Sequence, residues 1–404
     1  MTAVPLDPAL PEMRTMLDAE AMGEVLRRTL PDAAPLDGVT GRSLRYKPER
    51  SLVVRYDVSI GGRRHVATAM IAKSDLEHRA RKPQNLTLAE MVDGRSPAPF
   101  PLHYDRELGA LIQWFPLDVS VPALTRNPAE LVERLSERGA DIEQPPAEPM
   151  LLAYKPRRRA VLAIAGHVIK LYAREARFAA AVRGLRVSAT LPSVRAPRCR
   201  AVWPDLLATA QTREPGAPAT RSEESGARAG AVIAGVHAGS SEGLPAATPA
   251  RQLESAAASA RLVARIAPAL AVRVDRLLAE FERTRPDHLR LVTSHGDFYP
   301  KQLLVDPRGN LVLTDFDELC VAPAALDIAT YASYIWRRSP GQANGAQRAI
   351  DALLEGYGER PEGLPWYMAT MMLRRAAHPF RRFDPDWPER VQAIVGAAEA
   401  GLHA

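Results

Sequence analysis

Residues 289–334 decide the fold, and they read LRLVTSHGDFYPKQLLVDPRGNLVLTDFDELCVAPAALDIATYASY. Short apolar runs alternate with polar loops in this stretch. The pattern predicts three short strands and then a helix, over 289–293, 302–305, 311–314 and from Asp327 onward. Polar side chains between short buried strands are costly unless they serve a ligand or a hydrogen-bonded network. We therefore expect the chemistry of the protein here.

The two polar loops hold the candidate chemical groups, which are His295, Asp297 and Gln302 in the first loop and Asp315 and Asp317 in the second. Adjacent antiparallel strands would bring Asp297 and Asp315 to one end of a ribbon, where two carboxylates repel each other. A divalent cation between them, or one carboxylate acting as a base while the other binds metal, relieves that repulsion. The alternative is a ribbon with solvated acidic turns, because single aspartates are common turn residues.

Three segments in order, 295–302, 314–317 and 327–329, resemble the aminoglycoside phosphotransferase family, a kinase-like family that includes choline, maltose and glucosamine kinases. The resemblance is strong over 295–329 and extends weakly from Leu151 to the C-terminus. It implies an α+β, protein-kinase-like bilobal fold with a small β-rich N-lobe and a mostly helical C-lobe. It also implies ATP- and Mg²⁺-dependent phosphorylation of a hydroxyl on a small molecule, such as a sugar, an amino sugar or an aminoglycoside-like compound.

The resemblance assigns roles to three of these residues. Asp297 matches the catalytic aspartate that orients the acceptor hydroxyl and accepts its proton. Asp315 matches the carboxylate that ligates Mg²⁺ on the ATP phosphates. Gln302 stands where most members carry Asn, and in this it resembles members with Gln in the catalytic loop, such as maltose and glucosamine kinases. Its amide oxygen is the second candidate metal ligand.

Three further residues are supporting candidates. We interpret His295 as a brace of the loop rather than as a catalytic acid. Asp327 is interpreted as a second brace, and a plain helix N-cap is its alternative. Asp317 accompanies Asp315 in the metal loop.

Phosphoryl transfer also needs a cation near the nucleotide phosphates. The chain has six lysines, and Lys170 is the best candidate because it interrupts an apolar strand, with Glu175 as its expected partner. Lys73 is the rival. No Gly-rich phosphate loop is present in the sequence, so Arg158 in the turn 155–159 is the candidate for forked hydrogen bonds to phosphate, unless that turn is simply solvated.

A short repeat organises the N-terminal half. The sequence Tyr-Lys-Pro at 46–48 recurs at 154–156, and each copy enters a predicted strand–turn–strand unit. Gly61-Gly62 marks the first hairpin, between strands over 51–60 and 65–72. The repeat indicates a duplicated sheet lobe, although the motif alone is also a favourable turn entry. We predict three domains: an N-terminal α+β cap domain over 1–145, an N-lobe over 146–212 and a C-lobe over 213–404. The cap domain is interpreted as a duplicated N-lobe-like unit.

The acceptor site of such a fold is expected on the helices of 356–390. These helices mix Arg374 and Arg375 with acidic and aromatic residues, whereas a polycationic acceptor favours an acidic floor. Acceptor identity therefore stays open. The stretch over 253–283 has helical periodicity and predicts further helical structure.

Composition excludes several classes of protein. The chain has 404 residues, 46% of them hydrophobic and 25% charged, which is typical of globular domains. Two cysteines exclude a disulfide scaffold, and a net charge of +6 without a basic block argues against nucleic acid as a partner. No membrane segment is evident, so we expect a cytoplasmic protein. The alternatives to the kinase are a nucleotide-binding pseudokinase or scaffold and, opposed by the short spacing from Asp297 to Asp315, a protein kinase.

Overall fold

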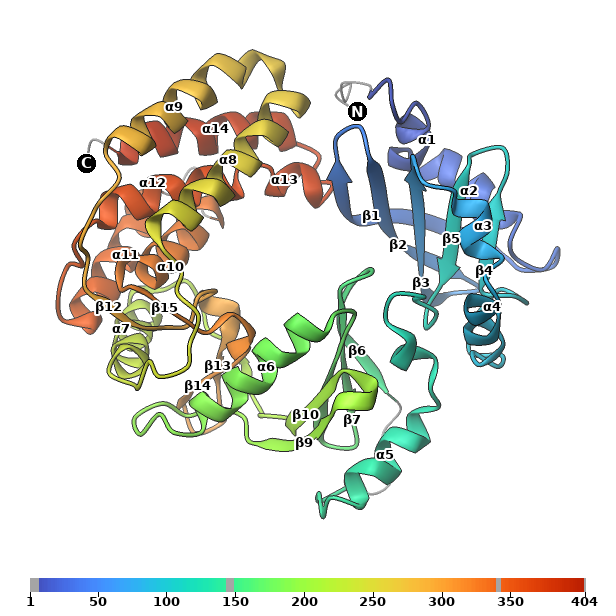
Figure 1. Cartoon of the computed structure of the whole chain (residues 1–404), viewed down its shortest axis with the longest axis horizontal. Coiled ribbons are helices and arrows are strands. Elements are labelled where there is room, and N and C mark those ends of the chain that lie inside the picture. Colours follow the sequence, from blue (N-terminus) through green and yellow to red (C-terminus); the bar gives the residue numbers. More distant parts are fainter. Residues whose placement is uncertain (1–6, 143–148, 339–342, 403–404) are drawn as a thin grey trace. The chain divides into compact units, whose positions relative to one another are not determined.

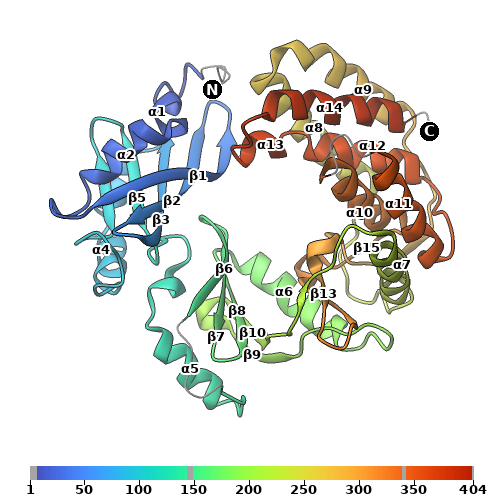
Figure 2. The same ribbon diagram turned by 180° about the vertical axis from the view of Figure 1, so that it is seen from behind.

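The computed structural model describes residues 7–142, 149–338 and 343–402 (Figures 1 and 2). The chain divides into two compact units. One consists of Met1–Glu175, Trp203–Ala210 and His378–Pro388, and the other of Ala176–Val202, Gln211–Ala377 and Glu389–Ala404. The boundaries predicted at 145 and 212 remain predictions. Among the described helices, none has the length and apolar character needed to cross a membrane.

The N-terminal sheet has five strands in the order β1-β2-β3-β5-β4, blue to cyan in Figure 1. They are β1 (Leu36–Lys47), β2 (Ser51–Ile60), β3 (Arg63–Ala72), β4 (Leu102–Asp105) and β5 (Ala110–Trp114). The predicted hairpin is confirmed, because Gly61 and Gly62 both adopt positive φ between β2 and β3. Strand β1, which is rich in glycine and polar residues, was expected only as the strand that enters the Tyr-Lys-Pro turn, without bounds.

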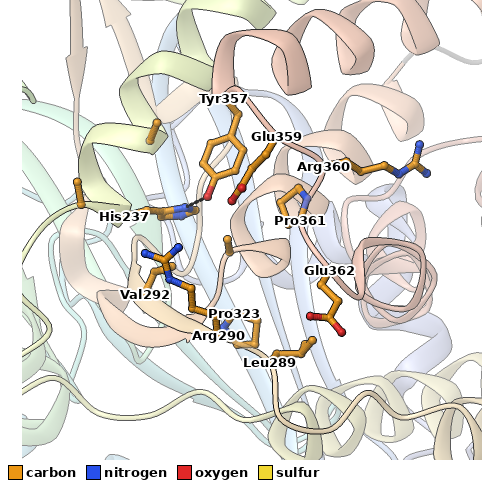
Figure 3. Close-up of a pocket in the computed structure, with 13 residues that line it drawn as sticks. His237, Leu289, Arg290, Val292, Pro323, Tyr357, Glu359, Arg360, Pro361 and Glu362 are labelled. Carbon is orange, nitrogen blue, oxygen red and sulfur yellow. Dashed lines mark hydrogen bonds between the residues drawn. The ribbon is translucent and has the colours of Figure 1, made fainter.

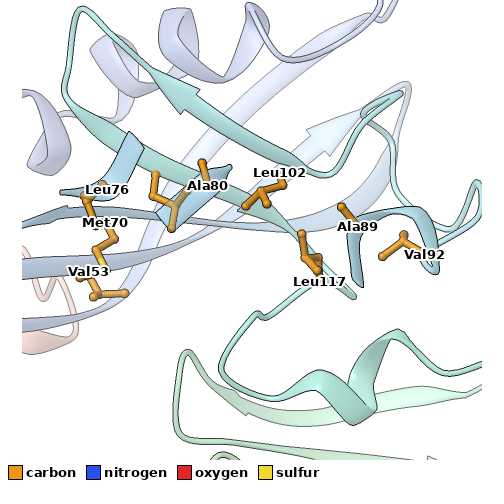
Figure 4. Close-up of a cluster of buried hydrophobic side chains, with 9 residues drawn as sticks. Val53, Met70, Leu76, Ala80, Ala89, Val92, Leu102 and Leu117 are labelled. Carbon is orange, nitrogen blue, oxygen red and sulfur yellow. The ribbon is translucent and has the colours of Figure 1, made fainter. Parts of the chain in front are cut away.

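Helices cover both faces of this sheet. Helices α1 (Met13–Leu17) and α2 (Ala19–Arg27) pack on one face, where the Tyr56 hydroxyl donates to the Met16 carbonyl oxygen at 2.6 Å. Helices α3 (Leu76–Ala80) and α4 (Pro83–Glu90) pack on the other. Figure 4 shows the apolar core beneath them, built from Val53, Met70, Leu76, Ala80, Ala89, Val92, Leu102, Leu111 and Leu117. Met70 pairs with Val53, which is three residues before Tyr56 on β2. Because strand side chains alternate between faces, Met70 and Tyr56 point to opposite faces of the sheet.

The second sheet also has five strands, in the order β6-β7-β8-β10-β9. They are β6 (Met150–Lys155), β7 (Arg159–Ile164), β8 (His167–Tyr172), β9 (Cys199–Trp203) and β10 (Ala208–Thr212). Helix α6 (Glu175–Ser188) follows β8, and helix α5 (Pro128–Ser136) precedes the sheet. The predicted strands over 159–165 and 167–173 are confirmed, each to within a residue or two of its end.

A buried carboxylate locks the first turn of the N-terminal sheet. The Asp7 carboxylate oxygen Oδ2 accepts from the Tyr46 hydroxyl and from the Glu49 backbone amide, both at 2.7 Å. Its other oxygen accepts from the Ala9 amide at 3.0 Å. Glu49 has a φ of 60°, a left-handed conformation that an L-residue adopts only at some cost. The Asp7 contact helps to hold it there.

The second sheet repeats this lock. The Asp118 oxygen Oδ2 accepts from the Tyr154 hydroxyl at 3.0 Å and from the Arg157 amide at 2.6 Å, and Oδ1 accepts from the Ser120 amide at 2.8 Å. Arg157 has a φ of 61°. Both aspartates are fully buried. The locks therefore match group for group, which supports the predicted duplication.

Strand register aligns the two sheets residue by residue. Val53 pairs with Met70 in the first sheet, and Val161 pairs with Lys170 in the second. The amide of Lys73 donates to the Arg50 carbonyl oxygen, as the amide of Ala173 donates to that of Arg158. Lys73 thus matches Ala173, and Met70 matches Lys170.

The rest of the chain is mainly helical. It contains α7 (Glu223–His237), α8 (Pro249–Ile266), α9 (Ala271–Arg283), α10 (Ala325–Arg338), α11 (Ala343–Tyr357), α12 (Leu364–Arg375), α13 (His378–Arg381) and α14 (Trp387–Gly401). The helical periodicity expected over 253–283 is confirmed as two helices, because the chain leaves α8 at Ala267 and Pro268 cannot donate the amide that a continuous helix needs. Five short strands belong to the same part of the chain. Strand β11 (Ala217–Pro218) precedes α7, and β12 (Leu291–Ser294), β13 (Leu303–Val305), β14 (Leu311–Leu313) and β15 (Cys320–Pro323) lie between α9 and α10.

Candidate active site

Two antiparallel strand pairs carry the acidic loops. Strand β13 pairs with β14 in antiparallel register, as the sequence predicts. Strand β12 pairs instead with β15, a strand that was not predicted. The Asp297 loop runs from β12 into β13, and the Asp315 loop runs from β14 into β15. Both loops therefore lie at the same end of the β13–β14 pair.

Hydrogen bonds tie the two loops together. The Thr314 amide donates to the Gln302 carbonyl oxygen at 2.8 Å, and the Thr314 hydroxyl donates to the same oxygen at 3.0 Å. The His295 nitrogen Nε2 lies 3.0 Å from the Thr314 carbonyl oxygen, to which it donates because a carbonyl can only accept. The fully buried His295 ring also packs against Phe316, with ring centroids 5.2 Å apart.

Gly296 is required by the backbone of this junction. Its φ is 80°, and a Cβ at this position would lie 2.2 Å from the Glu318 carbonyl oxygen. A side chain would therefore be both strained and in collision with the second loop. This contact explains why glycine separates His295 from Asp297.

The Asp327 side chain holds the backbone of the Asp297 loop in place. Its fully buried carboxylate accepts from the His295 amide at 2.7 Å and the Gly296 amide at 2.9 Å. A third donor is His237 Nε2, at 3.2 Å from Oδ2. These bonds satisfy a buried carboxylate with donors that all come from outside its own helix, α10.

Asp297 is accessible and oriented. Its side chain is 34% exposed, and Oδ1 accepts from the Arg375 guanidinium at 3.0 Å. Its second oxygen accepts no hydrogen bond from the residues that the structure describes. Arg375 lies in α12 and was predicted only as part of the acceptor region. Burial and the charge of Arg375 lower the pKa of the neighbouring Arg374.

Asp315 begins the second loop in a left-handed conformation, with a φ of 65°. The amide nitrogen Nε2 of buried Gln302 donates to its Oδ2 at 3.2 Å. Asp317 follows in a 3₁₀ turn over 316–318. The two predicted metal residues are thus in contact with each other.

The donors present fit magnesium. In the described ranges no three His, Cys, Asp or Glu side chains are grouped to hold a metal ion. Mg²⁺ in phosphoryl-transfer sites typically binds one or two protein oxygens and takes its other ligands from phosphates and water. A carboxylate beside an amide meets that requirement. The amide oxygen of Gln302 now faces the Thr314 hydroxyl at 3.5 Å, so its use as a ligand requires the amide to rotate.

Tyr299 reports the electrostatics of both loops. Burial, together with the negative charges of Asp297 and Asp315, raises the pKa of its hydroxyl to about 12. Its ring stacks on Tyr334 at a centroid distance of 5.0 Å. Both carboxylates therefore act on one hydroxyl group. Tyr299 was not predicted as a site residue.

The predicted nucleotide-binding residues lie on the second sheet and its edges. Lys170 is buried in β8, at 6% exposure. Arg158 is exposed in the β6–β7 turn, and Glu175 is exposed at the first residue of α6. Glu175 forms no hydrogen bond or ion pair with any described residue. The rival Lys73 is exposed beyond the end of β3.

Comparison with known proteins identifies the class. The model of the phosphotransferase enzyme family (APH) matches residues 151–369. This match covers more than half of the chain, and the protein therefore belongs to the phosphotransferase enzyme family. The expected resemblance and the α+β fold, with a β-sheet lobe and a helical part, are confirmed.

Several solved structures are similar. A macrolide 2'-phosphotransferase from Brachybacterium faecium is 21% identical over 66% of this chain and 97% of its own, with a TM-score of 0.46. An aminoglycoside phosphotransferase from Streptomyces rimosus is 17% identical over 61% and 97%, with a TM-score of 0.44. A choline/ethanolamine kinase family protein from Mesorhizobium loti is 15% identical over 64% and 89%, with a TM-score of 0.47. No curated protein matches the chain significantly in sequence.

Proposed function

We propose that the protein is an ATP- and Mg²⁺-dependent phosphotransferase that phosphorylates a hydroxyl of a small molecule. One observation carries this proposal. An accessible carboxylate, Asp297, and a second carboxylate, Asp315, lie on two loops that hydrogen bonds of Thr314 hold together. Membership of the phosphotransferase family supports the reaction class. The acceptor is proposed as a sugar, an amino sugar or an aminoglycoside-like compound.

Asp297 has the geometry of a general base. Arg375 holds one carboxylate oxygen, and the other is left to accept the proton of an acceptor hydroxyl. The acceptor oxygen then bonds to the γ-phosphorus of ATP while the bond to the β-phosphate oxygen breaks and ADP leaves. The Arg375 contact fixes the orientation of the base before the acceptor arrives.

Asp315 and Gln302 are the proposed metal-binding residues. When bound, Mg²⁺ neutralises charge on the nucleotide phosphates. In this proposal Lys170, Glu175 and Arg158 are the nucleotide-binding residues, and Lys170 supplies an ammonium for the phosphates. His295, Asp317 and Asp327 support the loops rather than contact the reacting atoms.

The decisive experiment measures ADP release from ATP and Mg²⁺ over a panel of sugars, amino sugars, aminoglycosides and amino alcohols. We expect at least one acceptor to raise ADP release well above the rate with water. Asp297→Asn should lower kcat about 10³-fold, the usual range for loss of a positioned base, while nucleotide affinity stays within about threefold. Asp287→Asn is the matched control, because Asp287 is exposed and forms no hydrogen bond with the described residues.

The metal assignment has its own test. Asp315→Asn should weaken Mg²⁺-dependent ATP binding in calorimetry by about tenfold or more, the effect of losing one charged ligand. Unchanged affinity would remove Asp315 from the metal site. Nucleotide binding without transfer to any acceptor would favour the pseudokinase instead.

A further inference from the structure

A cavity of about 480 Å³ opens in the helical part of the chain, away from the residues assigned above to the reacting atoms (Figure 3). It is bounded by the C-terminal end of α7, the start of β12, the end of β15 and the segment 357–362. Its apolar wall includes Leu289, Val292, Pro323 and Pro361. This volume is within the range of small-molecule sites.

The polar floor of the cavity is connected to the catalytic loop. The carboxylate of Asp327 can only accept, so His237 Nε2 donates to it at 3.2 Å, and His237 Nδ1 forms a hydrogen bond with the Tyr357 hydroxyl at 2.9 Å. The His237 side chain is only 4% exposed. Asp327 in turn holds the His295 and Gly296 amides. Three hydrogen-bonded groups thus link the cavity to the backbone beside Asp297.

Two opposite charges stand at the mouth of this cavity without being paired. Arg290 and Glu359 are both exposed, and neither forms a hydrogen bond or an ion pair within the described ranges. Figure 3 shows both side chains beside the cavity; Arg360 also lines it, but its guanidinium points away from the other side chains drawn. Burial and the charge of Glu359 raise the pKa of Tyr357 to about 12, and the charge of Arg290 opposes that rise. Both charges therefore act at the Tyr357 hydroxyl.

We propose that this cavity binds a small zwitterion whose carboxylate pairs with Arg290 and whose ammonium pairs with Glu359. A carbon chain between the two charges would lie on the apolar wall. Occupancy is transmitted to the catalytic loop through Tyr357, His237 and Asp327. The binding site does not depend on the proposed phosphotransfer, and it is tested without an activity assay.

Binding is measured by calorimetry on the full chain with a series of ω-amino acids from two to six carbons. The matched alkylamines and alkyl carboxylates serve as single-charge probes. We expect at least one zwitterion to bind with a Kd below about 5 mM, and its single-charge partners to bind about tenfold more weakly. Arg290→Ala and Glu359→Ala should each weaken binding about tenfold, and Arg360→Ala should change it less than about twofold.

Two results would overturn the site. One is that no zwitterion of the series binds, which would mean that Arg290 and Glu359 only neutralise each other in solution. The other is that binding is equal in the Arg290→Ala and Arg360→Ala variants.

Coupling is measured by hydrogen exchange of the His295 and Gly296 amides. These amides exchange only when the loop opens and their hydrogen bonds to Asp327 break. A ligand that binds only the state with these bonds intact should slow exchange about elevenfold when its concentration is ten times its Kd. Tyr357→Phe removes the link to His237, so a saturating zwitterion should still bind this variant but leave the exchange unchanged. Equal protection in the variant and the parent protein would disprove the proposed route.

Discussion

The sheet β1–β5 and the sheet β6–β10 have the same strand order and the same Asp–Tyr lock, yet they differ where the third strand faces the second. Met70 in the first sheet is part of the core beneath α3 and α4, whereas the matching residue in the second sheet is Lys170. Both sheets have the buried aspartate that accepts from a tyrosine hydroxyl, but at the position compared here only the second sheet has a cationic side chain, Lys170. We infer that the lock serves stability in both sheets and that Lys170 serves chemistry in one.

The largest effect should come from removing that difference. Lys170→Met gives the second sheet the residue of the first, and we expect kcat/KM for ATP to fall by about 10²-fold or more, since the variant lacks the cation proposed for the phosphates. Lys73→Met is the matched control and should stay within about twofold. Steady-state kinetics checks both variants, and equal losses would mean that Lys170 has no role in ATP use that Lys73 lacks.

Breaking either lock should be the next largest effect. Asp118→Ala and Asp7→Ala each leave a buried tyrosine hydroxyl and a left-handed backbone amide without their acceptor, so each should lower the free energy of unfolding by about 3 kcal/mol. Urea denaturation measures both values. A loss at Asp118 with none at Asp7 would show that only the second lock contributes to stability.

The tyrosines should contribute less, because their removal leaves the carboxylate with its amide donors. Tyr154→Phe and Tyr46→Phe should each cost about 1.5 kcal/mol, the contribution of a hydrogen bond to a charged group. Burial and the Asp118 charge raise the pKa of Tyr154, so it should remain a donor well above pH 10. The same denaturation experiment at pH 7 and pH 9 should therefore give the same difference between Tyr154→Phe and the parent protein.

The smallest effect concerns the left-handed residue itself. Glu49→Gly relieves the cost of a positive φ but adds freedom to the unfolded chain, so we expect a net gain in stability of no more than about 1 kcal/mol. Thermal unfolding compares it with Glu49→Ala, which keeps the strain and should show no gain. A clear loss in the glycine variant would mean that the Glu49 side chain itself contributes to the lock.

Local sequence patterns predict several elements of this structure. An apolar, β-branched run followed by Gly61-Gly62 predicts the β2–β3 hairpin, and the spacing of the polar loops predicts the β13–β14 pair. The failures are contacts between residues far apart in the chain. Asp7 lies 39 residues before Tyr46, and Arg375 lies 78 residues after Asp297, so no local pattern marks either partner. Strand β15 was missed because it is short and pairs with β12 across both acidic loops.

The contact between Gly296 and the Glu318 carbonyl oxygen has a wider consequence. One wall of the first loop is the backbone of the second, so any bulk added at 296 displaces the turn that holds Asp315 as well as the one that holds Asp297. A substitution at this position therefore shifts the proposed base and the proposed metal ligand together. We expect one mutation of Gly296 to impair both groups at once, rather than one after the other.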